Sequence, residues 1–156
     1  MKYLIKDAKC GITEGGIACG PVPGAVIAEA EFEDENGNVF WICLDEFDGV
    51  PCFYRSEKSL FDFRMMDLDD YENLPDDITD YIDDCVIHFS GYDYEDIFTE
   101  SDPESVELYR YLIWLVRCPQ GDDQKFIRET VGKHIGDFEI PMSDVEMDFR
   151  DIEYEY

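Results

Sequence analysis

Apolar and polar residues alternate over residues 25–47, which is the period of an extended strand with two different faces. The alternation is interrupted at Asn36-Gly37, a pair typical of the tight turn that joins the two strands of a β-hairpin. A further extended run covers residues 50–55. The pattern therefore predicts an antiparallel β-meander in the N-terminal third of the chain.

A two-residue turn sets the register of this hairpin, because it places Phe32 opposite Trp41 and Ala30 opposite Cys43. One face of the hairpin then carries Val26, Ala28, Ala30, Phe32, Trp41 and Cys43. The other face carries Glu29, Glu31 and Glu33, beside Phe40, Ile42 and Leu44. The predicted register thus separates an apolar face from a face that bears glutamates.

Beyond residue 55 the spacing of apolar residues changes from two to about 3.6, which predicts helices. The first helix has Ser56 as its N-cap. It carries Leu60, Phe61, Arg64 and Met65. The second helix has Pro75 in its first turn and Gly91 as its stop. Its apolar residues recur at helical spacing, and they are Leu74, Ile78, Ile82, Cys85, Val86 and Phe89.

The third helix has the clearest boundaries in the chain. Ser101 or Asp102 caps it, and Pro103 occupies its first position. It extends to Cys118, and Pro119 ends it. Because apolar residues surround most of its circumference, we expect it to be the central buried helix.

The rest of the chain completes the expected fold. A short fourth helix is predicted from Asp122 or Asp123 to Gly132, and the C-terminal residues 144–156 fit a strand better than a helix. The predicted fold class is α+β, with an N-terminal antiparallel β-meander packed against a helical middle segment and a strand at the C-terminus as an open alternative. We expect a single domain over residues 1–156. Its parts are a β-rich segment (1–55), a mainly helical segment (56–134) and an acidic C-terminal segment (135–156).

A stretch rich in glycine and proline, residues 10–24, has Cys10 and Cys19 within it. These two would form a zinc site with Cys43 and Cys52, but zinc ligands usually come in pairs separated by two to four residues, whereas eight residues separate these pairs. A phosphate-binding loop would require a lysine at the start of a helix, and the stretch has no lysine. We therefore interpret it as consecutive turns between strands.

Two other patterns could carry chemistry. Asp34, Asn36, Asn38 and Asp45 occupy four positions of a calcium-binding loop, but Val39 stands where that loop requires glycine. Cys85 and His88 lie three residues apart in the second helix, but Cys85 belongs to its apolar side. The chain has no hydrolase, metalloprotease, kinase or nucleotide-binding motif. We therefore predict no catalytic residue, no bound metal, no cofactor and no enzymatic activity.

The net charge of −27 results from 39 acidic and 12 basic residues. A charge of this sign repels nucleic acids and anionic membranes, so we expect no direct binding to either. No apolar run approaches the length of a signal-peptide core or of a membrane span. We expect the protein to remain in the cytoplasm.

The acidic residues are concentrated in the middle of the chain. Between Met65 and Tyr109 there are 16 aspartates and glutamates and no lysine or arginine. Aspartates four residues apart in the second helix repel one another, which disfavours the helix. Either this surface only keeps the protein in solution or it binds a partner. The residues predicted to bind that partner are Asp76, Asp77, Asp80, Asp83, Asp84, Tyr81, Tyr92 and Tyr94.

These observations favour a small binding protein that occludes a basic protein partner, such as a nuclease or a nucleic-acid-binding protein. In composition alone, the chain resembles bacterial immunity proteins and other acidic inhibitors that block the basic active sites of nucleases. The alternatives are a small enzyme or metal-dependent protein that uses cysteines or carboxylates, and a structural subunit with a solvated acidic surface.

Overall fold

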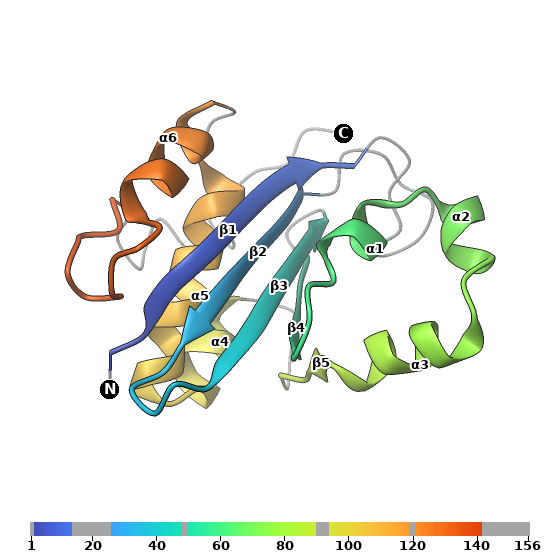
Figure 1. The fold of residues 1–156 in the computed structure, drawn as a ribbon, viewed down its shortest axis with the longest axis horizontal. Helices are drawn as coiled ribbons and strands as arrows, with labels where there is room; N and C mark the ends of the chain where they lie inside the picture. Colours follow the sequence, from blue (N-terminus) through green and yellow to red (C-terminus); the bar gives the residue numbers. More distant parts are fainter. Residues whose placement is uncertain (1, 14–25, 48–49, 90–93, 119–120, 142–156) are drawn as a thin grey trace.

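The computed structural model describes residues 2–13, 26–47, 50–89, 94–118 and 121–141. Within these ranges, five strands form one antiparallel sheet in the order in which they occur in the chain (Figure 1). The strands are β1 (Leu4–Ile12), β2 (Val26–Glu33), β3 (Val39–Phe47), β4 (Val50–Ser56) and β5 (Val86–Ile87). The predicted meander, including its strand at residues 50–55, is confirmed.

Helices precede and follow β5 along the chain. Those before it are α1 (Phe61–Met65), α2 (Leu68–Glu72) and α3 (Asp76–Asp84). Those after it are α4 (Tyr94–Glu100), α5 (Pro103–Arg117) and α6 (Asp122–Thr130). The first group packs on one face of the sheet and the second group on the other (Figure 1). The predicted α+β class is confirmed, and both faces of the sheet carry helices.

The hairpin register differs from the prediction by one residue. Strand β2 presents the expected residues to the core, but β3 presents Phe40, Ile42 and Leu44 beside them. The pairs Phe32–Phe40 and Ala30–Ile42 therefore replace the predicted pairs Phe32–Trp41 and Ala30–Cys43. Trp41 and Cys43 lie on the opposite face, since a shift of one residue exchanges the two sides of a strand.

The Asp34 side chain explains the shift. Its Oδ1 accepts hydrogen bonds from the backbone N–H groups of Asn36 and Asn38, each at 2.9 Å. The backbone N–H of Asp34 also donates to the carbonyl of Asn38 at 2.9 Å, which closes a loop of three residues instead of two. Gly37 supplies the positive φ of 84° that such a loop requires.

The first two predicted helices were wrong at their boundaries. Ser56 is the last residue of β4 and pairs with Trp41, so α1 begins five residues later, at Phe61. The predicted second helix extended to Gly91, but α3 ends at Asp84, and Val86 and Ile87 pair with β4 as strand β5. Neither α2 nor α4 was predicted.

The third and fourth predicted helices are confirmed as α5 and α6. Asp102 caps α5 by accepting a hydrogen bond from the Ser105 N–H at 2.9 Å, and Pro103 occupies the first turn. Helix α6 ends at Thr130, two residues before the predicted stop. The interpretation of residues 10–24 as turns was wrong at its start, because residues 10–12 belong to β1 and pair with β2. Residues 14–25, which hold the rest of that stretch, and the C-terminal segment 144–156 lie outside the described residues. The single domain over residues 1–156 stays a prediction.

The main core lies between the sheet and α5, which contacts β2 and β3. Small side chains at Ala28 and Ala30 of β2 face the bulky residues of α5. Tyr111 of α5 is fully buried, and its hydroxyl group lies 2.7 Å from Thr130 Oγ1 of α6. The prediction that the third helix is the central buried helix is therefore confirmed.

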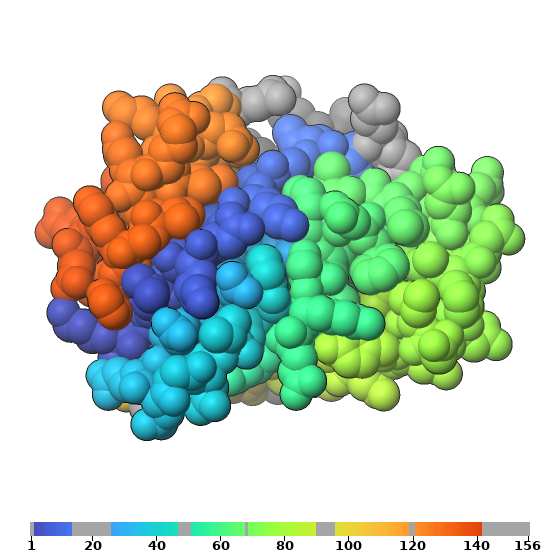
Figure 2. All heavy atoms as spheres, viewed as in Figure 1, coloured from blue at the N-terminus to red at the C-terminus, as the bar shows by residue number. Residues whose placement is uncertain are grey.

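A second cluster lies on the other face, beneath α1 and α3. Its buried residues are Ile27, Cys43, Tyr54, Leu60, Ile82 and Cys85. Helices α1 to α3 cover only part of this face, and Figure 2 shows strands β1 to β3 still visible beside them. Lys9 and Trp41 lie on this face and are half-buried, and the Lys9 ammonium group lies 5.6 Å from the centre of the Trp41 ring.

The segment after α6 covers part of the outer edge of β1. Ile5 donates its N–H to the carbonyl of Lys133 at 2.9 Å and accepts a hydrogen bond from Gly132 at 2.8 Å. The N–H of Ile135 donates to the carbonyl of Tyr3 at 2.8 Å. These bonds pair backbone groups that an edge strand otherwise leaves open.

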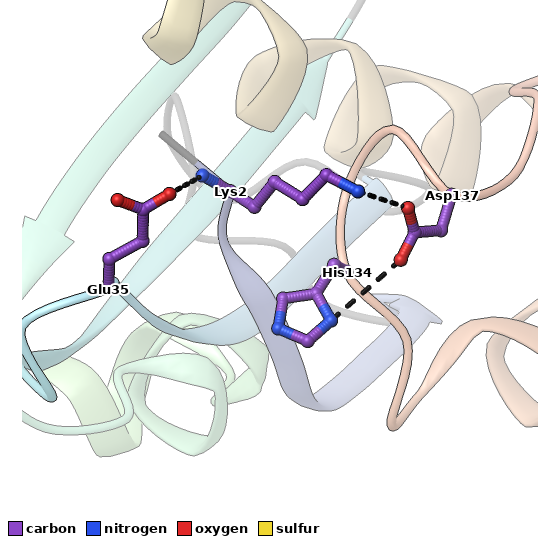
Figure 3. A network of polar contacts seen from close by, with 4 residues as sticks. All are labelled: Lys2, Glu35, His134 and Asp137. Atoms are coloured by element: carbon purple, nitrogen blue, oxygen red, sulfur yellow. Dashed lines mark hydrogen bonds and ion pairs between the residues drawn. The ribbon is translucent and has the colours of Figure 1, made fainter.

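Lys2 ties this segment to the β2–β3 turn (Figure 3). Its backbone N–H donates to Glu35 Oε1 at 2.9 Å, and its ammonium group forms an ion pair with Asp137 Oδ1 at 2.5 Å. His134 Nδ1 lies 3.9 Å from the other oxygen of Asp137. The cluster is exposed and connects chain segments, so we assign it a structural role.

Candidate functional site: the acidic face of helix α3

Helix α3 begins directly after Pro75, whose φ of −57° already suits a helix. Asp76 and Asp77 follow in the first turn, where the positive end of the helix dipole stabilises carboxylates. The helix ends at Asp84, and Cys85 caps it by donating its N–H to the carbonyl of Ile82 at 3.1 Å.

One side of α3 is anchored in the second cluster. Ile82 is only 1% exposed, and Ile78 and Tyr81 pack beside it. The predicted division of this helix into an apolar and an acidic side is therefore confirmed. The anchored side fixes which residues the helix presents to solvent.

The other side presents the five aspartates predicted to bind a partner. Each of them is exposed, and they are Asp76, Asp77, Asp80, Asp83 and Asp84. None forms an ion pair with a lysine, arginine or histidine in the part of the chain that the structure describes. We call these five residues the α3 acidic face.

Two features make this arrangement unfavourable for the helix itself. Asp83 and Asp84 lie in its last turn, close to the negative end of the helix dipole. Asp76, Asp80 and Asp84 repel one another at intervals of four residues, at a cost of about 0.2–0.5 kcal/mol for each pair. Helix stability therefore does not explain why Asp80, Asp83 and Asp84 stand in these positions.

The predicted tyrosines are not all brought to this face. Tyr81 is half-buried, and its hydroxyl oxygen accepts a hydrogen bond from the Glu57 N–H at 3.2 Å. Burial raises the pKa of the Tyr81 hydroxyl. Tyr92 lies outside the described residues. Tyr94 begins α4, and α4 packs on the opposite face of the sheet through Ile97.

A groove of about 760 Å³ adjoins the C-terminal end of α3. It lies between that end of the helix, the end of β4 and the β2–β3 turn. Residues from all three parts line it, including Asp34, Val39, Arg55, Glu57, Tyr81 and Asp84. Sequence analysis missed the groove, because its walls are up to 51 residues apart in the chain, from Asp34 to Cys85, and only the fold brings them together.

The sheet beneath α1 holds two further acidic residues that sequence analysis did not single out as buried. Asp45 is 1% exposed, and its Oδ2 accepts hydrogen bonds from Nε and Nη2 of Arg64, both at 2.6 Å. Burial alone lowers the pKa of the Arg64 guanidinium, but the Asp45 carboxylate outweighs this effect and the pKa is raised. The pair fastens α1 to β3.

Glu29 fastens the start of the same helix. Its side chain is fully buried, accepts a hydrogen bond from the Leu60 N–H at 2.7 Å and is bonded to the Ser59 hydroxyl. Helix α1 has no cap from its own side chains, so Glu29 supplies the missing acceptor. Burial raises the pKa of Glu29, and these hydrogen bonds oppose the rise.

The other patterns considered from the sequence are dispersed in the fold. Asp34 lies in the hairpin turn, whereas Asp45 lies about 20 Å further along β3, given about 3.3 Å per residue. Cys85 caps α3, and His88 follows β5 and is exposed. The prediction that Cys85 and His88 lie on one helix was therefore wrong.

The cysteines considered for zinc lie in different parts of the fold. Cys10 packs against the main core, whereas Cys43 and Cys52 belong to the second cluster on the other face of the sheet. Cys19 lies outside the described residues. Over the described ranges, no group of three or more histidines, cysteines or acidic residues is arranged to hold a metal ion.

Comparison with known proteins gives no relative on which an assignment could rest. No protein-family model matches the chain, and no curated protein or solved structure is significantly similar to it. In the described part of the chain, no helix has the length and apolar character needed to cross a membrane.

Proposed function

We propose that this protein binds and occludes a basic protein through the α3 acidic face, in the manner of an inhibitor or immunity protein. The observation that supports this most is the set of five exposed aspartates without a described cationic partner, of which Asp80, Asp83 and Asp84 stand in positions that weaken their own helix. A basic partner would supply the missing positive charge. Docking would then relieve the repulsion that the free protein carries.

The spacing of the carboxylates indicates the kind of partner. Asp76, Asp80 and Asp84 follow one another at one helical turn, or about 6 Å. A row of this kind complements the lysines and arginines that line phosphate-binding grooves. We therefore propose a nuclease or a nucleic-acid-binding protein as the partner. The charge of −27 argues against direct binding of nucleic acid by this chain.

A cytoplasmic location belongs to the same proposal. The five cysteines in the described residues are free thiols, which is the usual state in a reducing compartment.

Binding experiments with three forms of the protein test the proposal. The forms are the wild type, the α3 variant D80N/D83N/D84N, and a control variant, D122N/E129Q/E139Q, that removes three charges from α6 and the segment after it. All six positions are exposed, so both variants keep the fold and the same net charge. Each form is immobilised and exposed to lysate at low salt.

The proposal expects a basic protein that the wild type and the control retain and the α3 variant loses. Retention by the wild type is not sufficient evidence, because any acidic protein retains basic proteins. The test is whether the α3 variant and the control variant retain different proteins. A set of retained proteins that is the same for all three forms would contradict the proposal.

A further inference from the structure

The groove beside α3 distinguishes two kinds of basic partner. A flat basic surface would contact only the α3 acidic face, whereas a protruding side chain would also enter the groove. The β2–β3 turn and the C-terminal end of α3 form its walls and lie at the same end of the sheet (Figure 1).

The groove offers apolar surface at its rim. Val39 is 40% exposed, and it and Ile12 are the large apolar residues with exposed side chains in the part of the chain that the structure describes. The half-buried Tyr81 adds an aromatic side chain to the lining. Surface of this kind suits the aliphatic part of a long cationic side chain, which packs on apolar groups while its charged end stays hydrated.

The same groove offers free carboxylates. Glu57 and Asp84 both line it and are exposed, and neither forms an ion pair with a described cation. The Asp34 carboxylate is occupied by hydrogen bonds within the hairpin turn. Glu57 and Asp84 therefore remain to receive a positive charge.

Aromatic rings in this lining already hold cations of the chain itself. The Arg55 guanidinium lies 4.0 Å from the centre of the Phe40 ring, and the Lys58 ammonium group lies 4.6 Å from the centre of the Tyr81 ring. Such contacts show that these rings attract positive charge, and each contact occupies one face of its ring. They also hold Arg55, the one cation among the described lining residues, against a ring.

We propose that the groove receives one protruding arginine or lysine side chain of the basic partner. Its aliphatic part packs on Val39, next to the Tyr81 ring that Lys58 already contacts, and its charged end lies between Glu57 and Asp84. The inference rests on the proposed function, because it names the group of the partner that the same site accepts. It adds that the partner presents a loop or edge with an extended cation, and not only a flat basic surface.

Nuclear magnetic resonance with two cationic probes tests the inference. The first probe is the peptide acetyl-(Arg)6-amide, whose side chains can enter the groove. The second is hexaamminecobalt(III), a compact cation that binds carboxylates but has no aliphatic part. The inference expects the peptide to shift the amide signals of both α3 and the groove residues Val39 and Ser56. Hexaamminecobalt(III) should shift the signals of α3 and of Glu57, whose exposed carboxylates it reaches, but not the signal of the apolar Val39.

A pair of lysine variants provides the control. V39K places a positive charge at the groove, whereas I12K makes the same type of change at the other end of the sheet, where Ile12 is 51% exposed. V39K should weaken the affinity for the peptide at least about fivefold relative to I12K, because like charges then meet in the groove.

Each outcome bears on one of the two proposals. Peptide-induced shifts confined to α3, or equal affinities of V39K and I12K, would overturn the groove and leave the α3 acidic face in place. Failure of both probes to shift the α3 signals would overturn the proposed function as well.

Discussion

Carboxylates occur in two contrasting settings on the same side of the sheet. Glu29 and Asp45 are 0% and 1% exposed beneath α1, and each has hydrogen-bond partners that fasten that helix. The aspartates of the α3 acidic face are exposed on the outer side of the same helical layer and have no described cationic partner. Net charge counts both kinds equally, but only the exposed kind is available to another protein.

The difference separates stability from function. Removing a buried carboxylate or its partner should damage the fold, whereas removing an exposed one should leave the fold intact or improve it.

Arg64→Met should produce the largest loss of stability. It leaves the Asp45 carboxylate buried without its cation, which costs about 3–5 kcal/mol. The double variant R64M/D45L should recover much of this loss, since neither charge then remains buried. Urea denaturation measures both, with Lys58→Met as an exposed control that should change stability by less than about 0.5 kcal/mol. Equal stability of R64M and the control would mean that the buried pair does not hold α1.

Glu29→Ala should have the next largest effect. The substitution leaves the buried Leu60 N–H without its acceptor and should cost about 1–3 kcal/mol of unfolding free energy. Glu29→Gln keeps an acceptor oxygen and removes the buried charge, so it should cost much less. Chemical denaturation at pH 7 compares the two, and a glutamine variant as unstable as the alanine variant would count against this role.

The pH dependence of stability tests independently whether burial raises the pKa of Glu29. Because burial raises its pKa in the folded protein above the unfolded value, its contribution is fully present below the unfolded pKa and is lost as pH rises through the folded pKa. The wild type should therefore gain stability relative to Glu29→Gln as the pH is lowered from 7 toward the unfolded pKa of glutamate. Denaturation curves at several pH values test this expectation. A constant difference between the two proteins would contradict it.

The variant D80N/D83N/D84N should show the smallest effect, and in the opposite direction. It removes like-charge repulsion along α3 and should stabilise the protein by about 0.2–1 kcal/mol. The wild-type melting temperature should rise between low and physiological ionic strength, and the variant should depend less on salt. Calorimetry in a salt series measures both. A wild-type melting temperature that stays flat or falls would indicate that the carboxylates are already paired or bind specific cations.

The sequence predicted elements where a local signal sets the boundary. Asp102 and Pro103 define the start of α5, and the five aspartates of α3 alternate with apolar residues at helical spacing. Both features depend on neighbours within one or two turns. Their positions therefore follow from spacing alone.

Features that depend on distant residues were missed or wrong. The hairpin register depends on how the Asp34 side chain bonds within its turn, which the Asn36-Gly37 pair does not reveal. The two residues of β5 were assigned to a helix because they also fit helical spacing. Their pairing with the open edge of β4 favours the strand over the helix, and the sequence does not reveal this pairing. The burial of Glu29 depends on a backbone N–H that lies 31 residues away.

The candidate site shows the same division. Its charged face could be predicted from one helix, but the groove requires the hairpin turn and α3 to meet. Tyr81 was predicted as a contact residue from its position among aspartates, and the structure adds its bond to Glu57.

The central claim is that the α3 acidic face guides a basic partner into contact, and the rate of association tests it most directly. Stopped-flow mixing measures this rate for the wild type, D80N/D83N/D84N and D122N/E129Q/E139Q with the partner that the immobilised wild type isolates. At low salt the α3 variant should associate at least about tenfold more slowly than the wild type, and the control within about twofold, because steering depends on where the charges lie. Added salt should slow the wild type toward the rate of the variant. An α3 variant that associates as fast as the wild type at low salt would contradict the account, and its charge would then serve only to keep the protein in solution.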